Sequence, residues 1–135
     1  MDRAQLRSFL LVLTGCIFLG IALAGLVAPE AVADWYALTL QGTDGLNEYR
    51  AVFIGFWTGL FLMMAYAAQH PENVPLGNFA AILVLCQSLG RCLSVLLDGL
   101  PSFQFIFWGI GEMTLSLLIL ALAPDPLRAR AEPPA

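Results

Sequence analysis

The chain is poor in charge, and no lysine occurs in it. Only 12% of its 135 residues are charged, whereas soluble domains carry about 25%. All six basic residues are arginines, and the formal net charge is −4. This acidic balance excludes the basic surface that nucleic-acid binding needs, so we expect no nucleic acid among its partners.

Residues that commonly bind cofactors are also scarce. The single histidine, His70, lies beside a proline and outside the apolar segments. Cys16, Cys86 and Cys92 show no C-x-x-C spacing, which predicts buried unreactive thiols rather than a redox pair. No G-x-S-x-G motif and no phosphate-binding glycine loop occurs. We therefore predict no metal and no cofactor. The sequence leans against an enzyme but does not decide the question.

Hydrophobic residues make up 59% of the chain and gather in four long runs. These runs are about 6–28, 51–68, 76–97 and 103–123. Each is close to the roughly 20 residues that a helix needs to cross a bilayer. Because a helix satisfies its backbone hydrogen bonds internally, we predict an all-α fold. The predicted fold is an antiparallel, up-down bundle of four transmembrane helices, which forms one integral membrane domain over 1–135.

The segment at about 30–38 joins the first two runs and carries Trp35 and Tyr36. Such rings are enriched at membrane surfaces. We predict a short amphipathic helix that lies in the outer interface. An irregular loop anchored by the same two rings is the alternative.

Arginines lie near both termini of the chain. Arg3 and Arg7 accompany the first run, and Arg128 and Arg130 follow the last. Apart from Arg50, which opens the second run, the connections between runs contain no basic residue. The positive-inside rule then places both termini in the cytoplasm, and we expect a multi-pass protein of the cell inner membrane.

Two opposite charges lie inside the apolar runs. Arg91 and Glu112 stand near the middle of the last two runs, where a charge costs on the order of 2.5–3.5 kcal/mol on insertion scales. Counted from the intervening hairpin at about 1.5 Å per residue, they lie roughly 14 and 18 Å deep. An arginine side chain spans that difference. We therefore predict that the two side chains meet inside the bundle.

Further polar residues accompany this pair. The candidate cluster consists of Glu48, Arg50, Gln87, Arg91, Ser94, Asp98 and Glu112. Its members between 87 and 98 share one face of a helix, because they are spaced four, three and four residues apart. Glu48 and Arg50 open the second helix on the same outer side, so we expect them to join the cluster. Its role is either to fasten the bundle or to form a ligand or proton site, and the sequence leaves both open.

Small residues predict where helices approach closely. Gly55 and Gly59 form a G-x-x-x-G pattern in the second run, and Gly15 and Gly25 belong to a similar strip in the first. We expect these strips to pack helices within the chain rather than to join two copies. Association of two copies into a homo-oligomer is the alternative.

Several short motifs together resemble a known family. They are Asn47-Glu48-Tyr49-Arg50-Ala51, Gly90-Arg91 with Ser94, Asp98-Gly99-Leu100-Pro101 and Glu112. In order and spacing they are similar to an uncharacterised bacterial family of four-helix integral membrane proteins, the domain of unknown function 4345. The resemblance extends from the first helix to Ala123. It implies the four-span architecture and draws attention to the charged cluster, but it brings no reaction, substrate or cofactor.

Three functions compete on this evidence. The first is a non-enzymatic accessory or binding module, surrounded by membrane lipid and by a membrane-protein partner or a second copy. The alternative is a small proton- or cation-coupled transporter in which Glu112 titrates. Small multidrug exporters carry their acid in the first helix, however, and here that helix has none. The least favoured is a lipid- or quinone-handling protein with a headgroup at Arg50, because no nucleophile or redox centre is evident.

Overall fold

The computed structural model describes residues 1–124, and these form helices joined by short connections, with no strand among them. The helices are α1 (Arg3–Val27), α2 (Pro29–Trp35), α3 (Gly42–Tyr49), η1 (Arg50–Phe56), α4 (Trp57–Gln69), α5 (Val74–Asp98) and α6 (Phe103–Ala121). The element η1 is a π-helix, and α3, η1 and α4 form one continuous helix. Four helices are long and apolar enough to cross a membrane, which confirms the predicted all-α architecture.

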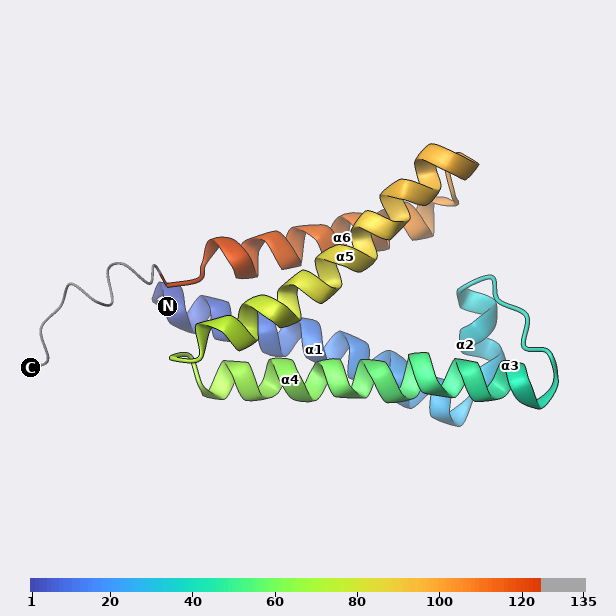
Figure 1. The fold of residues 1–135 in the computed structure, drawn as a ribbon, viewed down its shortest axis with the longest axis horizontal. Helices are drawn as coiled ribbons and strands as arrows, with labels where there is room; N and C mark the ends of the chain where they lie inside the picture. The colour runs from blue at the N-terminus through green and yellow to red at the C-terminus, as the bar shows by residue number, and fades with distance from the viewer. Residues whose placement is uncertain (125–135) are drawn as a thin grey trace, which may run out of the picture.

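Successive long helices run in opposite directions, as Figure 1 shows. The start of α1 and the end of α6 lie at the same end of the molecule, where the Arg3 guanidinium donates a hydrogen bond to the carbonyl of Ala121. The loop 99–102, which joins α5 to α6, lies at the opposite end of the molecule. Arg128 and Arg130, on which the predicted orientation also rests, lie outside the described residues.

The second long helix begins earlier than its apolar run. It starts at Gly42 rather than near residue 51, because the polar turns of α3 continue directly into the apolar part. Hydropathy finds only the apolar part. Gly42 has a φ of +58°, a left-handed conformation that suits glycine and separates α3 from the preceding loop.

The tightest part of the core lies between α1 and α4. Leu11 and Met64 are fully buried there. A Cβ added at Gly15 would lie 3.3 Å from the Met64 Cβ, so the two helices approach closely at this glycine. At Gly59, by contrast, an added Cβ meets no described atom within 4 Å, and at Gly55 it meets only a carbonyl oxygen of its own helix. The prediction that Gly55 and Gly59 pack another helix of the same chain is therefore wrong for residues 1–124.

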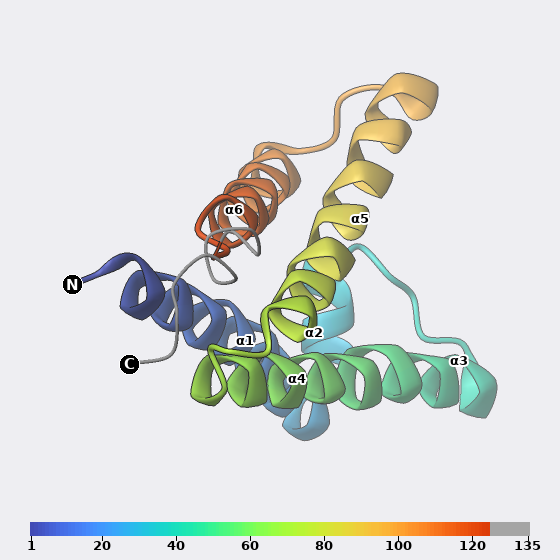
Figure 2. The same cartoon turned by 60° about the vertical axis from the view of Figure 1, so that its left-hand side comes forward.

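The α5/α6 hairpin leans away from α1 and α4 toward its loop. Figures 1 and 2 show this divergence from two directions. The helix α5 buries residues only between Gly77 and Ser88, and α6 buries only Ser116 and Ile119. In α6 these lie in the half nearer the C-terminus, and in α5 none lies beyond Ser88. The outer half of the hairpin is thus free of close contact with the other two long helices.

The three cysteines lie exposed on helix surfaces rather than buried, so that prediction is wrong. The reason is that apolar residues cover both faces of these helices. In a membrane-type sequence the outer face is as hydrophobic as the inner one, so membership of an apolar run does not reveal which side chains point inward.

The segment predicted to form a short helix contains α2. This helix buries Val32 and Ala33 against the bundle and leaves Trp35 exposed. Pro29 stands at its first position, where a missing N–H costs nothing. Tyr36, which follows α2 directly, turns inward instead of acting as a surface anchor, and this places it in the site described next.

Candidate functional site

The carboxylate of Glu112 on α6 binds two side chains of α5. Arg91 holds it with a fork, Nε lying 3.0 Å from Oε2 and Nη2 lying 3.2 Å from Oε1. Gln87 donates from Nε2 to the same Oε1 at 3.0 Å. The side chains of Arg91 and Glu112 are 25% and 18% exposed. This geometry is the strong form of an ion pair, because both donors of the guanidinium plane meet the carboxylate.

Local sequence makes the pairing possible. A Cβ at Gly109 would lie 3.3 Å from the Arg91 Cδ, so this glycine lets the arginine cross the surface of α6. The Arg91 guanidinium also lies over the ring of Phe105, 6.0 Å from its centre. Ser116 donates its hydroxyl proton to the Glu112 carbonyl at 2.6 Å. Arg91 and Glu112 thus meet between α5 and α6, as predicted.

The other residues of the predicted cluster lie elsewhere. Ser94 donates to Asp98 at 3.0 Å, but both side chains are exposed and belong to the same helix. Glu48 and Arg50 are exposed, and within residues 1–124 neither makes a side-chain hydrogen bond or an ion pair with another member. The physical reason is the divergence of the hairpin, which separates the outer parts of α5 and α6 from η1. The structure therefore assembles Gln87, Arg91 and Glu112 only.

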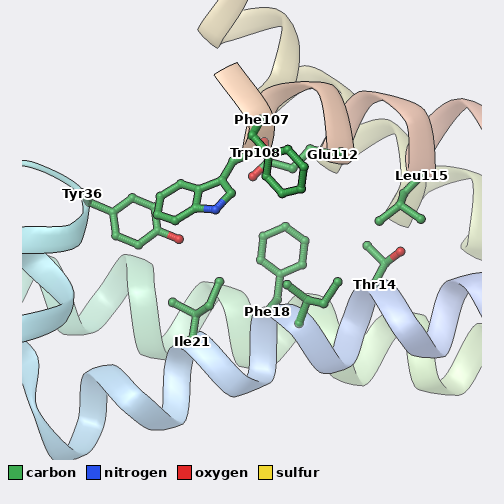
Figure 3. A pocket seen from close by; sticks show the side chains of 10 residues that line it. Thr14, Phe18, Ile21, Tyr36, Phe107, Trp108, Glu112 and Leu115 are labelled. Atoms are coloured by element: carbon green, nitrogen blue, oxygen red, sulfur yellow. The ribbon is translucent and has the colours of Figure 1, made fainter. Parts of the chain in front are cut away.

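A cavity of about 260 Å³ opens between α1 and α6, on the side of Glu112 away from α5 (Figure 3). Four aromatic residues line it: Phe18 from α1, Tyr36, and Phe107 and Trp108 from α6. Aliphatic side chains of α1 and α6 complete the walls. Glu112 is the one acidic residue among those that line it. The cavity is therefore an apolar site with aromatic walls and a single, already paired carboxylate.

Tyr36 closes one end of this cavity. Its ring centre lies 5.0 Å from those of both Phe53 and Trp108, and 5.7 Å from that of Trp57. Beside it, Gln104 donates from Nε2 to the Trp35 carbonyl at 3.3 Å and ties the end of α2 to α6. Burial raises the pKa of Tyr36 to about 12. The phenol therefore stays protonated at neutral pH and remains a hydrogen-bond donor.

Thr14 lines the cavity from α1. Its side chain is directed toward Leu115 of α6 in Figure 3. The residue is only 2% exposed, and its hydroxyl oxygen has no hydrogen-bond partner among the described residues. A buried hydroxyl without a partner costs on the order of 1–3 kcal/mol, so such groups are rare in folded proteins.

Arg7, which the sequence placed only as a flanking residue, is 3% exposed and joins three helices. Its Nε donates to the Ile119 carbonyl at 3.2 Å, and its Nη2 donates to the Asn78 Oδ1 at 2.9 Å and to the Val74 carbonyl at 3.3 Å. A Cβ at Gly77 would lie 2.5 Å from this Nη2, so the glycine makes room for the guanidinium. Sequence reasoning missed this role because the partners are mainly backbone carbonyls, which every residue has.

The chemistry of the site is that of hydrogen bonding and apolar contact. Besides the paired carboxylate of Glu112, the polar side chains that line the cavity are those of Thr14, Tyr36 and Trp108, all of them uncharged. Sequence reasoning did not select any of the three, because a threonine, a tyrosine and a tryptophan in or near apolar runs carry no distinctive spacing. Within residues 1–124, no group of three or more His, Cys, Asp or Glu side chains is placed to hold a metal ion.

Comparison with known proteins gives one result. The family model described as "Domain of unknown function (DUF4345)" matches residues 6–123. This range contains both partners of the ion pair and every helix, apart from the first three residues of α1. No curated protein and no solved structure matches the chain. Since the family model covers most of its length, the chain belongs to the DUF4345 family.

Proposed function

We propose that this protein is a small integral membrane module that binds a lipophilic molecule and catalyses no reaction of its own. The observation that supports this is the cavity between α1 and α6, whose walls are aromatic and aliphatic side chains. Ligand sites for small molecules have this character, being concave and mostly apolar with few polar groups. The resident molecule would be a component of the lipid phase.

The exposed surface supports a membrane location. Leu96 and Phe103 on the hairpin are 81% and 80% exposed, and many other large apolar residues are exposed on all four long helices. Such a surface is far more apolar than monomeric soluble proteins present to water. A surface covered by lipid acyl chains does not carry the free-energy cost of exposing apolar groups to water. With Arg3 at the end shared by α1 and α6, the positive-inside rule puts that end in the cytoplasm.

The ion pair stabilises the wall of the cavity by fixing the position of α6. Trp108 precedes Glu112 by four residues on α6, so the two side chains lie on adjacent turns of one face. By binding Glu112, Arg91 and Gln87 fix the rotation of α6 and hold Trp108 in the cavity wall. Because the Glu112 carboxylate already accepts three hydrogen bonds, this geometry favours the binding module over a carrier that uses Glu112.

The experiment is to purify the full chain in a mild detergent and identify bound lipophilic molecules by mass spectrometry. Gly111 lines the cavity, and a Cβ added there meets no described atom within 4 Å, so Gly111→Leu fills the cavity without a clash at Cβ. Gly20→Leu is the matched control, because Gly20 is exposed on α1 and also has open space.

The wild-type chain and Gly20→Leu should retain the same molecule, and Gly111→Leu should retain roughly tenfold less of it. The reason is that loss of buried apolar contact should weaken the binding free energy by about 1.4 kcal/mol or more. Equal retention by all three chains, with the purified proteins equally helical, would contradict the proposal.

A further inference from the structure

Apart from the paired carboxylate of Glu112, the polar side chains that line the cavity are neutral. Figure 3 shows the hydroxyl of Tyr36 and the ring nitrogen of Trp108 directed into the space bounded by Phe18 and Ile21. The indole N–H only donates, and a phenol donates readily. The cavity therefore offers donors to a ligand that can accept.

The charge within the site is already balanced. Glu112 is held by both nitrogen donors of the Arg91 fork and by Gln87. A cationic or anionic ligand would lose its solvation in the cavity and would find no free counter-charge there. The site therefore favours an uncharged ligand.

The size of the cavity narrows the shape of that ligand. An apolar protein cavity of about 150 Å³ holds a benzene molecule, and this one measures about 260 Å³. The space therefore suits a six-membered ring with substituents. Aromatic walls favour a flat ring, since ring pairs attract in offset-stacked and edge-to-face arrangements.

We propose that the cavity binds a neutral, lipid-soluble ring that carries a carbonyl group, as a quinone does, and that Tyr36 and Trp108 donate hydrogen bonds to the carbonyl oxygen. This assignment rests on the proposed binding function and names its ligand class. An acyl ester offers the same carbonyl chemistry without the ring, so the experiment separates the two sources.

The raised pKa of Tyr36 agrees with this role, because the hydroxyl keeps its proton throughout the neutral range. Arg91 and Glu112 act on this phenol in opposite directions and lie beside it, and Tyr49 adds a smaller influence. None of these groups accepts the Tyr36 proton in a hydrogen bond within the described residues, so the donor is free for a ligand.

The test uses the full chain in bilayer discs of ether-linked phospholipid, which contain no ester carbonyl. Calorimetric titration follows binding of three probes: a decyl-substituted benzoquinone, decylbenzene and dioctanoylglycerol. Heat measured with Gly111→Leu discs gives the baseline for partition into the bilayer. We expect the quinone to bind the wild-type chain and Gly20→Leu equally. Tyr36→Phe and Trp108→Phe should each weaken its binding about two- to tenfold, the effect of one lost neutral hydrogen bond.

Each other result has a distinct meaning. If decylbenzene binds as tightly as the quinone and neither variant weakens binding, the carbonyl assignment is overturned while the proposed function stands. If only dioctanoylglycerol binds, the ring assignment is overturned. If no probe gives heat above the Gly111→Leu baseline and no molecule co-purifies with the protein, both the ligand class and the proposed function are overturned.

Discussion

At the level of single residues, the contact between Arg91 and Glu112 could be predicted from the chain alone. The two charges lie at similar depth on helices joined by a short turn, so an antiparallel hairpin has to bring them near each other. Arg7 shows where such reasoning ends. Its main acceptors are carbonyls of α5 and α6, and no side-chain pattern marks a carbonyl as a partner.

Removal of one member of the ion pair should destabilise the protein more than replacement of both. Arg91→Ala and Glu112→Ala each leave an uncompensated charge between α5 and α6, and we expect each to lower the free energy of unfolding by about 1–3 kcal/mol. The double variant Arg91→Met, Glu112→Leu leaves no charge behind and should lose less than the sum of the two. Unfolding by SDS in mixed micelles, followed by circular dichroism, measures all three. A double variant as unstable as that sum would contradict the fastening role.

At the level of helices, the decisive contacts occur where a glycine of α1 meets α3 or α4. Gly25 lies against the hydroxyl of Tyr49, which is buried and has no partner among the described residues. Tyr49 stacks on Phe53 with ring centres 4.7 Å apart, and Phe53 contacts Trp57 at 4.4 Å. This aromatic row runs along the π-helix η1 and faces α1. Gly25 thus packs against α3, as the small-residue strip of the first run predicted, whereas Gly59 contacts no other helix among the described residues.

Gly25→Ala should lower the free energy of unfolding by about 1–3 kcal/mol, because the new methyl group overlaps the Tyr49 hydroxyl. The control is Gly20→Ala on the same helix, where the added Cβ has open space and alanine's helix propensity is favourable. The partner variant Tyr49→Phe removes only a hydroxyl without a hydrogen bond, so by itself it should be close to neutral.

Combining Gly25→Ala with Tyr49→Phe should restore most of the lost stability, since the overlapping atom is gone. The same micelle unfolding assay measures each chain. If the combined variant is as unstable as Gly25→Ala alone, the contact between this glycine and the hydroxyl does not limit the packing of α1 against α3.

At the level of the whole molecule, the divergence of the α5/α6 hairpin decides which polar residues meet. Glu48 and Arg50 share the outer half of the molecule with Asp98, but the two helix pairs separate toward that end. The same divergence leaves room for the cavity between α1 and α6, which Tyr36 partly closes. The arrangement thus removes one expected site and creates another.

The proposed orientation predicts that the hairpin 99–102 and the loop between α4 and α5 lie on opposite sides of the membrane. In a chain whose three native cysteines are replaced by alanine, Ser102→Cys should react with a membrane-impermeant maleimide in intact cells. Glu72→Cys should react only after permeabilisation. The reverse pattern would invert the orientation, and labelling of both positions in intact cells would contradict a spanning bundle.

The sequence by itself determined the four long helices, their alternating direction and the meeting of Arg91 with Glu112, because span length, chain connectivity and the cost of an isolated charge in an apolar medium act locally or between neighbouring helices. Only the tertiary structure decided which face of each helix points inward, since apolar residues cover both faces. It also decided that Arg7 binds carbonyls of α5 and α6, that Tyr36 turns into the bundle, and that Glu48 and Arg50 stay apart from the ion pair. Those outcomes depend on the angle between the two helix pairs, and that angle is set by the sum of many packing contacts rather than by any one motif.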